Sequence, residues 1–234
     1  MKKLLKVIIV FDLVVLIVIT AGVAGNLLNM ERVTQVFHML SPDREDTKEE
    51  LKKVAITFDD GPNPDYTEQI LDVLREKDVK ATFFLLGSEV EKYPELVKKI
   101  YDEGHLIGNH SFKHEQLNKM TSAQACEQVN KTNQLIYDIT GEYPQYLRPP
   151  FGEWKNDLDC QVNMINVMWD IDTLDWKNQN QGRIVENVMT KAKENDIILM
   201  HDGYDTTISA TLQLIDMLRE KGYEFVTVDE LILE

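Results

Sequence analysis

Cysteine is nearly absent from this sequence, because Cys126 and Cys160 are the only two in 234 residues. They lack the close spacing of a zinc-binding knuckle or of a redox-active pair, so neither kind of local motif is present. A chain of this length buries enough apolar surface to fold without a covalent staple. We therefore expect two free thiols in helical stretches, with a disulfide between them as the alternative.

Positive charge is also scarce. The chain has 25 Lys and Arg against 40 Asp and Glu, for a net charge of −15. Its first 25 residues carry +2, which leaves −17 on the rest of the chain. Such a surface repels phosphate backbones and disfavours docking on anionic lipid by charge alone. The charge balance argues against nucleic acid as a partner and does not oppose an uncharged ligand.

The sequence has one long apolar run, at its N-terminus. Lysines precede Val7–Ala24, which is interrupted only by Asp12 and Thr20 and approaches the ~20 residues that span a bilayer. The run predicts an uncleaved membrane anchor. The two alternatives are a cleaved signal peptide with the core Leu13–Ala24 and a buried core helix. Basic residues stay on the cytoplasmic side, so export as an anchor or a signal peptide places the rest of the chain outside the cell.

A segment of weak pattern follows this run. Ser41-Pro42-Asp43-Arg44-Glu45-Asp46 is polar and contains a helix breaker, which is typical of a linker. We therefore divide the chain into an anchor or signal segment at 1–25, a stalk at 26–53 and one folded domain at 54–234. A short helix is predicted over Glu31–Leu40, within the stalk.

From Val54 onward, short apolar runs alternate with segments of helical period. This alternation indicates parallel β/α units, and Gly104, Gly141 and Gly222 stand where helix C-terminal caps are expected. About seven strands are predicted, and periodicity does not choose between an open doubly wound sheet and an irregular barrel. The predicted strands are 54–58, 81–86, 106–108, 146–148, 165–169, 197–200 and 225–228, and the predicted helices are 67–76, 94–103, 122–140, 183–194 and 208–221.

Polar residues directly follow five of the predicted strands. Parallel β/α folds place their chemistry at the C-terminal ends of the strands. We therefore expect these five groups to converge on one site. They are Asp59-Asp60-Gly61-Pro62, Asn109-His110, Arg148-Pro149-Pro150, the residues from Asp170 to Asp175, and His201-Asp202.

Two of these groups predict a metal site. His110 and His114 are four residues apart, a spacing that brings two imidazoles to one face of a helical turn. Asp59 and Asp60 would point to opposite faces of a regular strand, but Gly61-Pro62 breaks the strand and lets both aim at one cleft. One Asp with two His leaves a coordination position open for water, as in hydrolytic zinc sites. Two solvated loop histidines are the alternative.

His201, Arg148 and Asp175 are ambiguous when they are taken singly. His201 follows an apolar run and is equally well explained by a local hydrogen bond. Arg148 and Asp175 are equally well explained as an internal ion pair. Their interpretation as site residues depends on their combination with the Asp and His residues above.

Five short motifs follow one another within residues 54–230. They are Thr57-Phe58-Asp59-Asp60-Gly61-Pro62, His110-Ser111-Phe112-Lys113-His114, Arg148-Pro149-Pro150-Phe151-Gly152, Asp172-Thr173-Leu174-Asp175-Trp176 and Leu199-Met200-His201. In this order and spacing they resemble the motifs of the NodB-homology polysaccharide deacetylases, which form carbohydrate esterase family 4. Any one motif can arise by chance, but five in order are a specific signal. The resemblance implies an α/β fold, a distorted (β/α) barrel of about seven parallel strands, which decides the choice that periodicity leaves open.

The resemblance also implies roles for the polar residues. Asp60, His110 and His114 would hold one divalent metal ion, usually zinc and sometimes cobalt or another divalent ion. Asp59 would be the general base, and His201 the general acid.

Further residues are implied to support this chemistry. Arg148 would orient Asp59, and Asp175 would orient and polarise His201. Trp176 and Leu199 would shape an apolar pocket for the acetyl methyl group. Phe151 stands where the family often has tyrosine; its backbone N–H would still serve the oxyanion hole, but a substrate contact through a phenol would be lost.

The implied activity is hydrolysis of N-acetyl groups on an amino-sugar polymer. The family and the predicted wall-facing tether favour peptidoglycan N-acetylglucosamine as the substrate. Chitin oligomers and acetylated xylan are alternative substrates, and a non-catalytic wall-binding module is the alternative outside enzymes. The implied location is the cell membrane with the domain outside, or secretion after signal cleavage, and no protein partner is implied.

The apolar run generates a prediction about topology. Cell fractionation should find the full-length chain with the membranes, and external protease should digest its folded domain, because Val7–Ala24 would anchor it and the lysines would stay inside. Recovery of the full-length chain as a soluble cytoplasmic protein would contradict this topology.

Overall fold

The computed structural model describes residues 51–154, 160 and 164–232. The predicted anchor at 1–25 and the predicted stalk, apart from its last three residues, lie outside these residues. Within the described part of the chain, no helix has both the length and the apolar character needed to cross a membrane.

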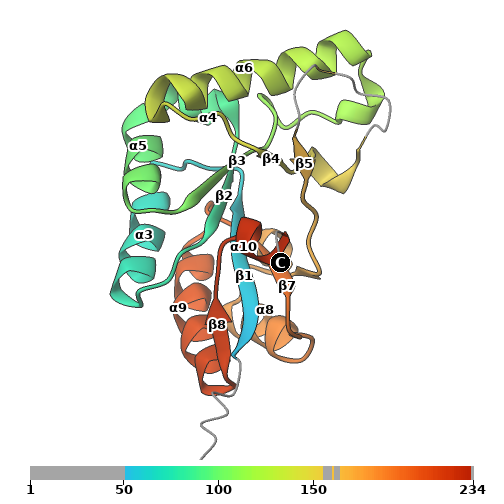
Figure 1. The fold of residues 1–234 in the computed structure, drawn as a ribbon. Helices are drawn as coiled ribbons and strands as arrows, with labels where there is room; N and C mark the ends of the chain where they lie inside the picture. Colours follow the sequence, from blue (N-terminus) through green and yellow to red (C-terminus); the bar gives the residue numbers. More distant parts are fainter. Residues whose placement is uncertain (1–50, 155–159, 161–163, 233–234) are drawn as a thin grey trace, which may run out of the picture. The chain divides into compact units, whose positions relative to one another are not determined.

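All described strands belong to one parallel sheet, which is centred on β1 (Lys52–Asp59) (Figure 1). The strand order is β5-β4-β3-β2-β1-β7-β6. β8 (Tyr223–Phe225) pairs with the first residues of β1, while β2 pairs with its last residues. The other strands are β2 (Thr82–Leu85), β3 (Leu106–Asn109), β4 (Tyr146–Leu147), β5 (Ile165–Asn166), β6 (Ile171–Asp172) and β7 (Asp196–His201).

The prediction of a parallel α/β fold is confirmed, and the sheet curls into a half-barrel. No ladder joins the end strands β5 and β6 among the described residues. The two-residue strand β6 is absent from the sequence prediction, because so short a pairing leaves no periodic signal.

Helices flank the sheet, and two of them have the predicted bounds. These are α3 (Thr67–Glu76) and α6 (Ser122–Thr140). A capping box between Thr121 and Gln124 begins α6, and Gly141 ends it at φ 81°, a conformation that only glycine adopts freely. The others are α4 (Gly87–Lys92), α5 (Pro94–Asp102), α7 (Asp175–Asn178), α8 (Gln181–Met189), α9 (Asp205–Glu220) and α10 (Val228–Ile232), with the 3₁₀ turns η2 (Leu117–Lys119) and η3 (Pro150–Gly152).

Two predicted elements near the C-terminus are wrong in their bounds. The helix predicted to reach residue 194 ends at Met189, and a turn with Asn195 at φ 66° leads into β7. The predicted strand 225–228 ends at Phe225, and Val228 begins α10 instead. At the start of α10, Thr227 donates from its backbone N and its Oγ1 to Glu230 Oε1, while Glu230 N donates to Thr227 O.

Alternation along β1 assigns its residues to opposite faces of the sheet. Val54, Ile56 and Phe58 pack into the large core with α3, α5 and α9. Ala55 packs instead with Phe84 in a smaller cluster on the other side, which we call the inner face. Because successive side chains on a strand point to opposite faces, residues 57 and 59 share the inner face with Ala55. One face of β1 is therefore apolar and packs into the core, while the inner face carries polar residues toward the C-terminal end of the strand.

Cys126 of α6 and Cys160 form a disulfide, with their Cα atoms 5.0 Å apart. The expectation of two free thiols is therefore wrong, and the alternative holds. The two residues are 34 positions apart in the chain, and only the fold brings Cys160 to Cys126 of α6. Disulfides persist in oxidising compartments, so the bridge is consistent with an exported domain.

The disulfide generates a prediction about stability. Combining Cys126→Ser with Cys160→Ser should lower the free energy of unfolding by about 2–4 kcal/mol, because the bridge restricts the unfolded chain. Urea unfolding of both proteins measures the difference. A reductant should bring the wild-type curve onto that of the variant and leave the variant unchanged, whereas superimposable curves without reductant would contradict the prediction.

Candidate active site

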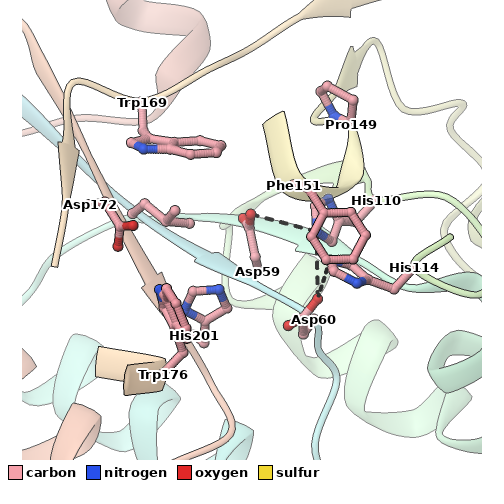
Figure 2. Close-up of a pocket in the computed structure, with 11 residues that line it drawn as sticks. Asp59, Asp60, His110, His114, Pro149, Phe151, Trp169, Asp172, Trp176 and His201 are labelled. Carbon is pink, nitrogen blue, oxygen red and sulfur yellow. Dashed lines mark ion pairs between the residues drawn. The ribbon is translucent and has the colours of Figure 1, made fainter. Parts of the chain in front are cut away.

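The C-terminal ends of the strands enclose a pocket of about 440 Å³. In the pairing of β1 with β7, Asp59 lies opposite His201, so two predicted site residues meet at one edge of the sheet. Residues from all five polar groups line the pocket or lie directly behind it, as expected (Figure 2). The lining residues are Asp59, Asp60, His110, His114, Pro149, Phe151, Trp169, Asp172, Trp176, Leu199 and His201.

Asp60, His110 and His114 form a group that can hold a metal ion (Figure 2). One donor atom from each lies within 4.8 Å of the others. Asp60 Oδ1 is 3.5 Å from His110 Nε2 and 3.5 Å from His114 Nε2. Asp60 reaches this group because its φ of 75° turns it away from the alternation of β1, as the strand break at Gly61-Pro62 predicts.

A loop, not a helical turn, brings the two histidines together. Residues 110–114 are non-helical, and Ser111 and His114 have φ of 68° and 56°. The buried Asn109 side chain fixes this loop, because its Oδ1 accepts from Ser111 N at 2.7 Å and its Nδ2 donates to Val129 O at 2.9 Å. Ser111 Oγ in turn accepts from His114 N at 3.2 Å. The i, i+4 spacing predicted the pairing but assigned it to the wrong local structure.

The chemistry of these donors fits a divalent cation. His110 Nδ1 lies 2.7 Å from Arg148 O, and since a carbonyl only accepts, Nδ1 carries the proton and Nε2 presents its lone pair. The pKa of His110 is lowered to about 3, mainly by burial, so the ring is neutral. Asp60 Oδ1 is buried without a hydrogen-bond partner among the described residues. A carboxylate that faces imidazole lone pairs calls for a cation between them.

Asp59 is held by the fully buried Arg148. Arg148 Nη1 donates to Asp59 Oδ1 at 2.8 Å and to Thr57 Oγ1 at 2.7 Å. The remaining guanidinium donors reach the carbonyl oxygens of Val167 and Met168. Burial raises the pKa of Asp59, and the Arg148 charge opposes that rise. The carboxylate is therefore fixed in direction and made more basic than an exposed aspartate.

His201 has a matching support in the fully buried Asp175. Asp175 Oδ1 lies 2.7 Å from His201 Nδ1, while its Oδ2 accepts from His201 N at 2.7 Å and from Thr207 Oγ1 at 2.8 Å. Burial alone would lower the pKa of His201, but the hydrogen bond and negative charge of Asp175, with Asp59 and Asp60, raise it to about 9. His201 is thus a protonated imidazole at neutral pH.

Aromatic side chains form the rim of the pocket. Phe151 and Trp176 are 57% and 48% exposed, which is unusual for large apolar residues and leaves both free to contact a ligand. Leu199 also lines the pocket and is buried. In Figure 2, Trp169 lies across Asp59 from Phe151. Trp169 was not predicted as a site residue, although it ends the predicted strand 165–169. Asp172 was expected at the site only as a member of the group from Asp170 to Asp175, without a role of its own.

A sequence model of the family described as "Polysaccharide deacetylase" matches residues 45–167, more than half of the chain. The chain belongs to this family. It is 41% identical over 180 residues to the peptidoglycan-N-acetylglucosamine deacetylase PgdA of Listeria monocytogenes, an alignment that covers 77% of this chain and 39% of that protein. The chain thus spans about two fifths of the length of this curated relative.

Solved structures of the family share the fold. The structure of peptidoglycan deacetylase PdaC from Bacillus subtilis matches with a TM-score of 0.75 and 42% identity, over 78% of this chain and 91% of that one. A family pseudoenzyme from Bacillus anthracis matches with a TM-score of 0.74 and 32% identity, over 78% of this chain and 66% of that one. Members with and without activity therefore share this architecture, so the site and not the fold must carry an assignment of function.

The Asp175–His201 pair generates a prediction about pH. Asp175→Asn should lower the pKa of His201 from about 9 toward 6.5 or below, because burial then acts without its main opposing charge. A raised pKa gives the folded state stability that is fully present below pH 6.5 and is lost as pH rises through about 9. NMR titration of the imidazole signals measures the pKa of His201, and urea unfolding at a series of pH values measures its contribution to stability.

His105 is a matched control for this titration. Burial lowers its pKa to about 4, and neither Asp175 nor His201 contributes to that shift, so the variant should leave it unchanged. An unchanged His201 pKa in Asp175→Asn would contradict the role of the pair.

Proposed function

We propose that the chain is a divalent-metal-dependent hydrolase that removes N-acetyl groups from an amino-sugar polymer, with peptidoglycan N-acetylglucosamine as its substrate. One observation carries the proposal. A three-donor cation group lies in the same pocket as a carboxylate backed by arginine and a protonated histidine backed by aspartate. The names of the PgdA and PdaC relatives support a peptidoglycan substrate.

The proposal includes the arrangement of the whole chain. Residues 1–25 would anchor it in the cell membrane by a single pass, residues 26–53 would form a stalk, and residues 54–234 would form the catalytic domain, a distorted (β/α) barrel outside the cell. The Cys126–Cys160 disulfide supports an oxidising location. Secretion after signal cleavage is the alternative, which the fractionation above would reveal.

Asp60, His110 and His114 would hold the metal, and zinc is the proposed ion because two imidazoles and one carboxylate suit it. When bound, such an ion supplies a Lewis acid that polarises the amide carbonyl and favours loss of a proton from water. The Arg148 carbonyl that fixes the His110 tautomer would act as the supporting hydrogen-bond partner usual for a ligating histidine.

Asp59 would act as the general base. Arg148 holds its carboxylate on the inner face of β1, where the carboxylate lines the pocket, so Asp59 would take a proton from the attacking water. The raised pKa of this buried carboxylate makes it a stronger base than an exposed aspartate. Arg148 would orient Asp59 without contacting substrate.

His201 would act as the general acid. An amide nitrogen leaves poorly unless it is protonated, and a pKa of about 9 keeps His201 protonated at neutral pH. Asp175 would orient the ring and stabilise its charge. Phe151 would offer its backbone N–H to the developing oxyanion, and Trp176 with Leu199 would receive the acetyl methyl. The products are acetate and a free amino sugar.

A non-catalytic wall-binding module is the competing assignment, because a family pseudoenzyme shares the fold. If the chain were such a module, at least one metal donor or one residue of the Asp59–Arg148 and His201–Asp175 pairs should be missing. In this chain all of these side chains are present: the three donors, Asp59 and His201 line one pocket, and Arg148 and Asp175 bond to Asp59 and His201 from behind it. A catalytic role is therefore the better explanation of the site.

Acetate release tests the proposal. Purified protein should release acetate from peptidoglycan faster than from chitin oligomers or acetylated xylan, and chelation should abolish release reversibly. Mass spectrometry of the digested wall should identify the amino sugar that has lost its acetyl group, and loss from N-acetylmuramic acid alone, the sugar named for the PdaC relative, would contradict the proposed N-acetylglucosamine. Full activity of a demonstrably metal-free sample would contradict the mechanism, and faster release from xylan would contradict the substrate.

Two adjacent carboxylates with different roles generate the sharpest prediction. Asp59→Asn should retain the metal and lose about 10²–10⁴-fold in turnover, the usual scale for a positioned general base. Asp60→Asn should weaken metal binding first, with activity partly restored by excess metal. His201→Ala should retain the metal and lose more rate on an amide than on an aryl acetate ester, whose leaving group needs no proton.

Metal content and both rates, measured for the three variants, decide these roles. The two Asp→Asn changes serve as controls for each other, because they are the same substitution at neighbouring positions. Loss of the metal in Asp59→Asn with retention in Asp60→Asn would reverse the assignment.

A further inference from the structure

Asp202 directly follows the proposed general acid and is buried beneath the turn that carries Asp60. Its side chain is 1% exposed. A Cβ added at Gly61 would lie 2.9 Å from Asp202 Cγ and closer still to Oδ2, so the Asp202 carboxylate fills the space that a side chain at position 61 would need. β1 and β7 pair up to Asp59 and His201, which brings the next residues of both strands together. Asp202 is therefore packed directly against the Asp60 turn.

A short hydrogen-bond chain joins Asp202 to this turn. The hydroxyl of the buried Thr67, at the start of α3, donates to Asp202 Oδ2. Thr67 Oγ1 accepts from Asn63 N at 2.7 Å, and Thr67 N donates to Asn63 O at 3.0 Å. The turn, the first residue of α3 and the end of β7 are thereby tied into one unit.

The turn needs such support because of its backbone. Asp60 has a φ of 75°, which costs of order 1–3 kcal/mol for a residue other than glycine and persists only where the surroundings enforce it. The same conformation points Oδ1 of Asp60 at the two histidines. Whatever holds the turn therefore holds a donor of the cation group.

The burial of Asp202 is not explained by stability alone. Its Oδ1 is buried and has no hydrogen-bond partner among the described residues, and Asp60 and His201 are charged neighbours. A buried carboxylate that is only half satisfied destabilises a fold relative to an apolar residue of similar size. Its position between the proposed metal ligand and the proposed acid supplies a functional reason.

We propose that Asp202, together with Thr67, is a positioning residue that holds the Asp60 turn in the geometry required for metal binding. This inference rests on the proposed function, since it concerns the same metal. Because Asp202 follows His201 in the chain, the dipeptide His201-Asp202 both supplies the proposed acid and supports the turn that carries the proposed metal ligand Asp60. The role requires an acceptor at the Oδ2 position and a hydroxyl on residue 67, and it does not require the negative charge of Asp202.

Zinc affinity, measured by competition with a chromogenic chelator, tests this role. Asp202→Ala and Thr67→Val should each bind Zn²⁺ about 10–100-fold more weakly, the usual cost of losing a group that orients a metal ligand. Asp202→Asn and Thr67→Ser should stay within about threefold of wild type, because an amide oxygen and a serine hydroxyl preserve the hydrogen bond. Thr132→Val is the matched control, since it removes a buried threonine hydroxyl that donates to its own helix at Gln128 O.

The outcomes separate this role from the proposed function. A wild-type chain that does not bind Zn²⁺ overturns both. If wild type binds Zn²⁺ and Asp202→Ala and Thr67→Val bind it with the same affinity, the positioning role alone is overturned. It is also overturned if Asp202→Asn binds Zn²⁺ as weakly as Asp202→Ala, because the effect would then come from the charge of Asp202. Circular dichroism checks folding, and if Asp202→Ala does not fold, Thr67→Val decides, because it removes a hydroxyl without changing side-chain shape.

Discussion

The buried Arg148 side chain is the interaction on which the rest of the site depends. Its guanidinium binds Asp59 and Thr57 of β1, while its own carbonyl oxygen fixes the tautomer of His110. One residue of the loop after β4 thus orients the proposed base and a proposed metal ligand together. A fully buried guanidinium is costly unless every donor is satisfied, and here each nitrogen has an acceptor. The surrounding backbone is shaped to provide those acceptors.

The same principle recurs at each functional group of the pocket. Asp175 is hydrogen-bonded to His201, Thr207 is hydrogen-bonded to Asp175, and Asn109 is hydrogen-bonded to the loop that carries His110 and His114. These partners lie on strand ends and helix starts, so they are as rigid as the fold. A site built this way meets developing charge with dipoles already in place, which is the main source of electrostatic catalysis. The aromatic rim of Phe151 and Trp176 is instead exposed to solvent and open to contact with a ligand.

Several elements were predictable because their signal is local. α3 and α6 have the predicted bounds, since apolar spacing and caps such as Gly141 lie within the segment itself. Elements defined by distant pairing were not predictable in the same way. β6 exists only as two residues beside β7, and the helical turn expected for His110 and His114 is a loop held by Asn109. Cys126 and Cys160 were expected to be free thiols but form a disulfide, because their pairing also depends on a contact between distant positions in the chain.

The sequence by itself determined the alternation of strands and helices, the polar groups at the strand ends and the family motifs, because each is written within a few consecutive residues. The tertiary structure alone decided which atoms meet. It brought the Asp60 carboxylate to 3.5 Å from the Nε2 atoms of His110 and His114, and it buried Asp202 beneath Gly61. Contacts of this kind depend on strand register and curl, which arise from packing across the whole sheet and leave no trace in any single segment.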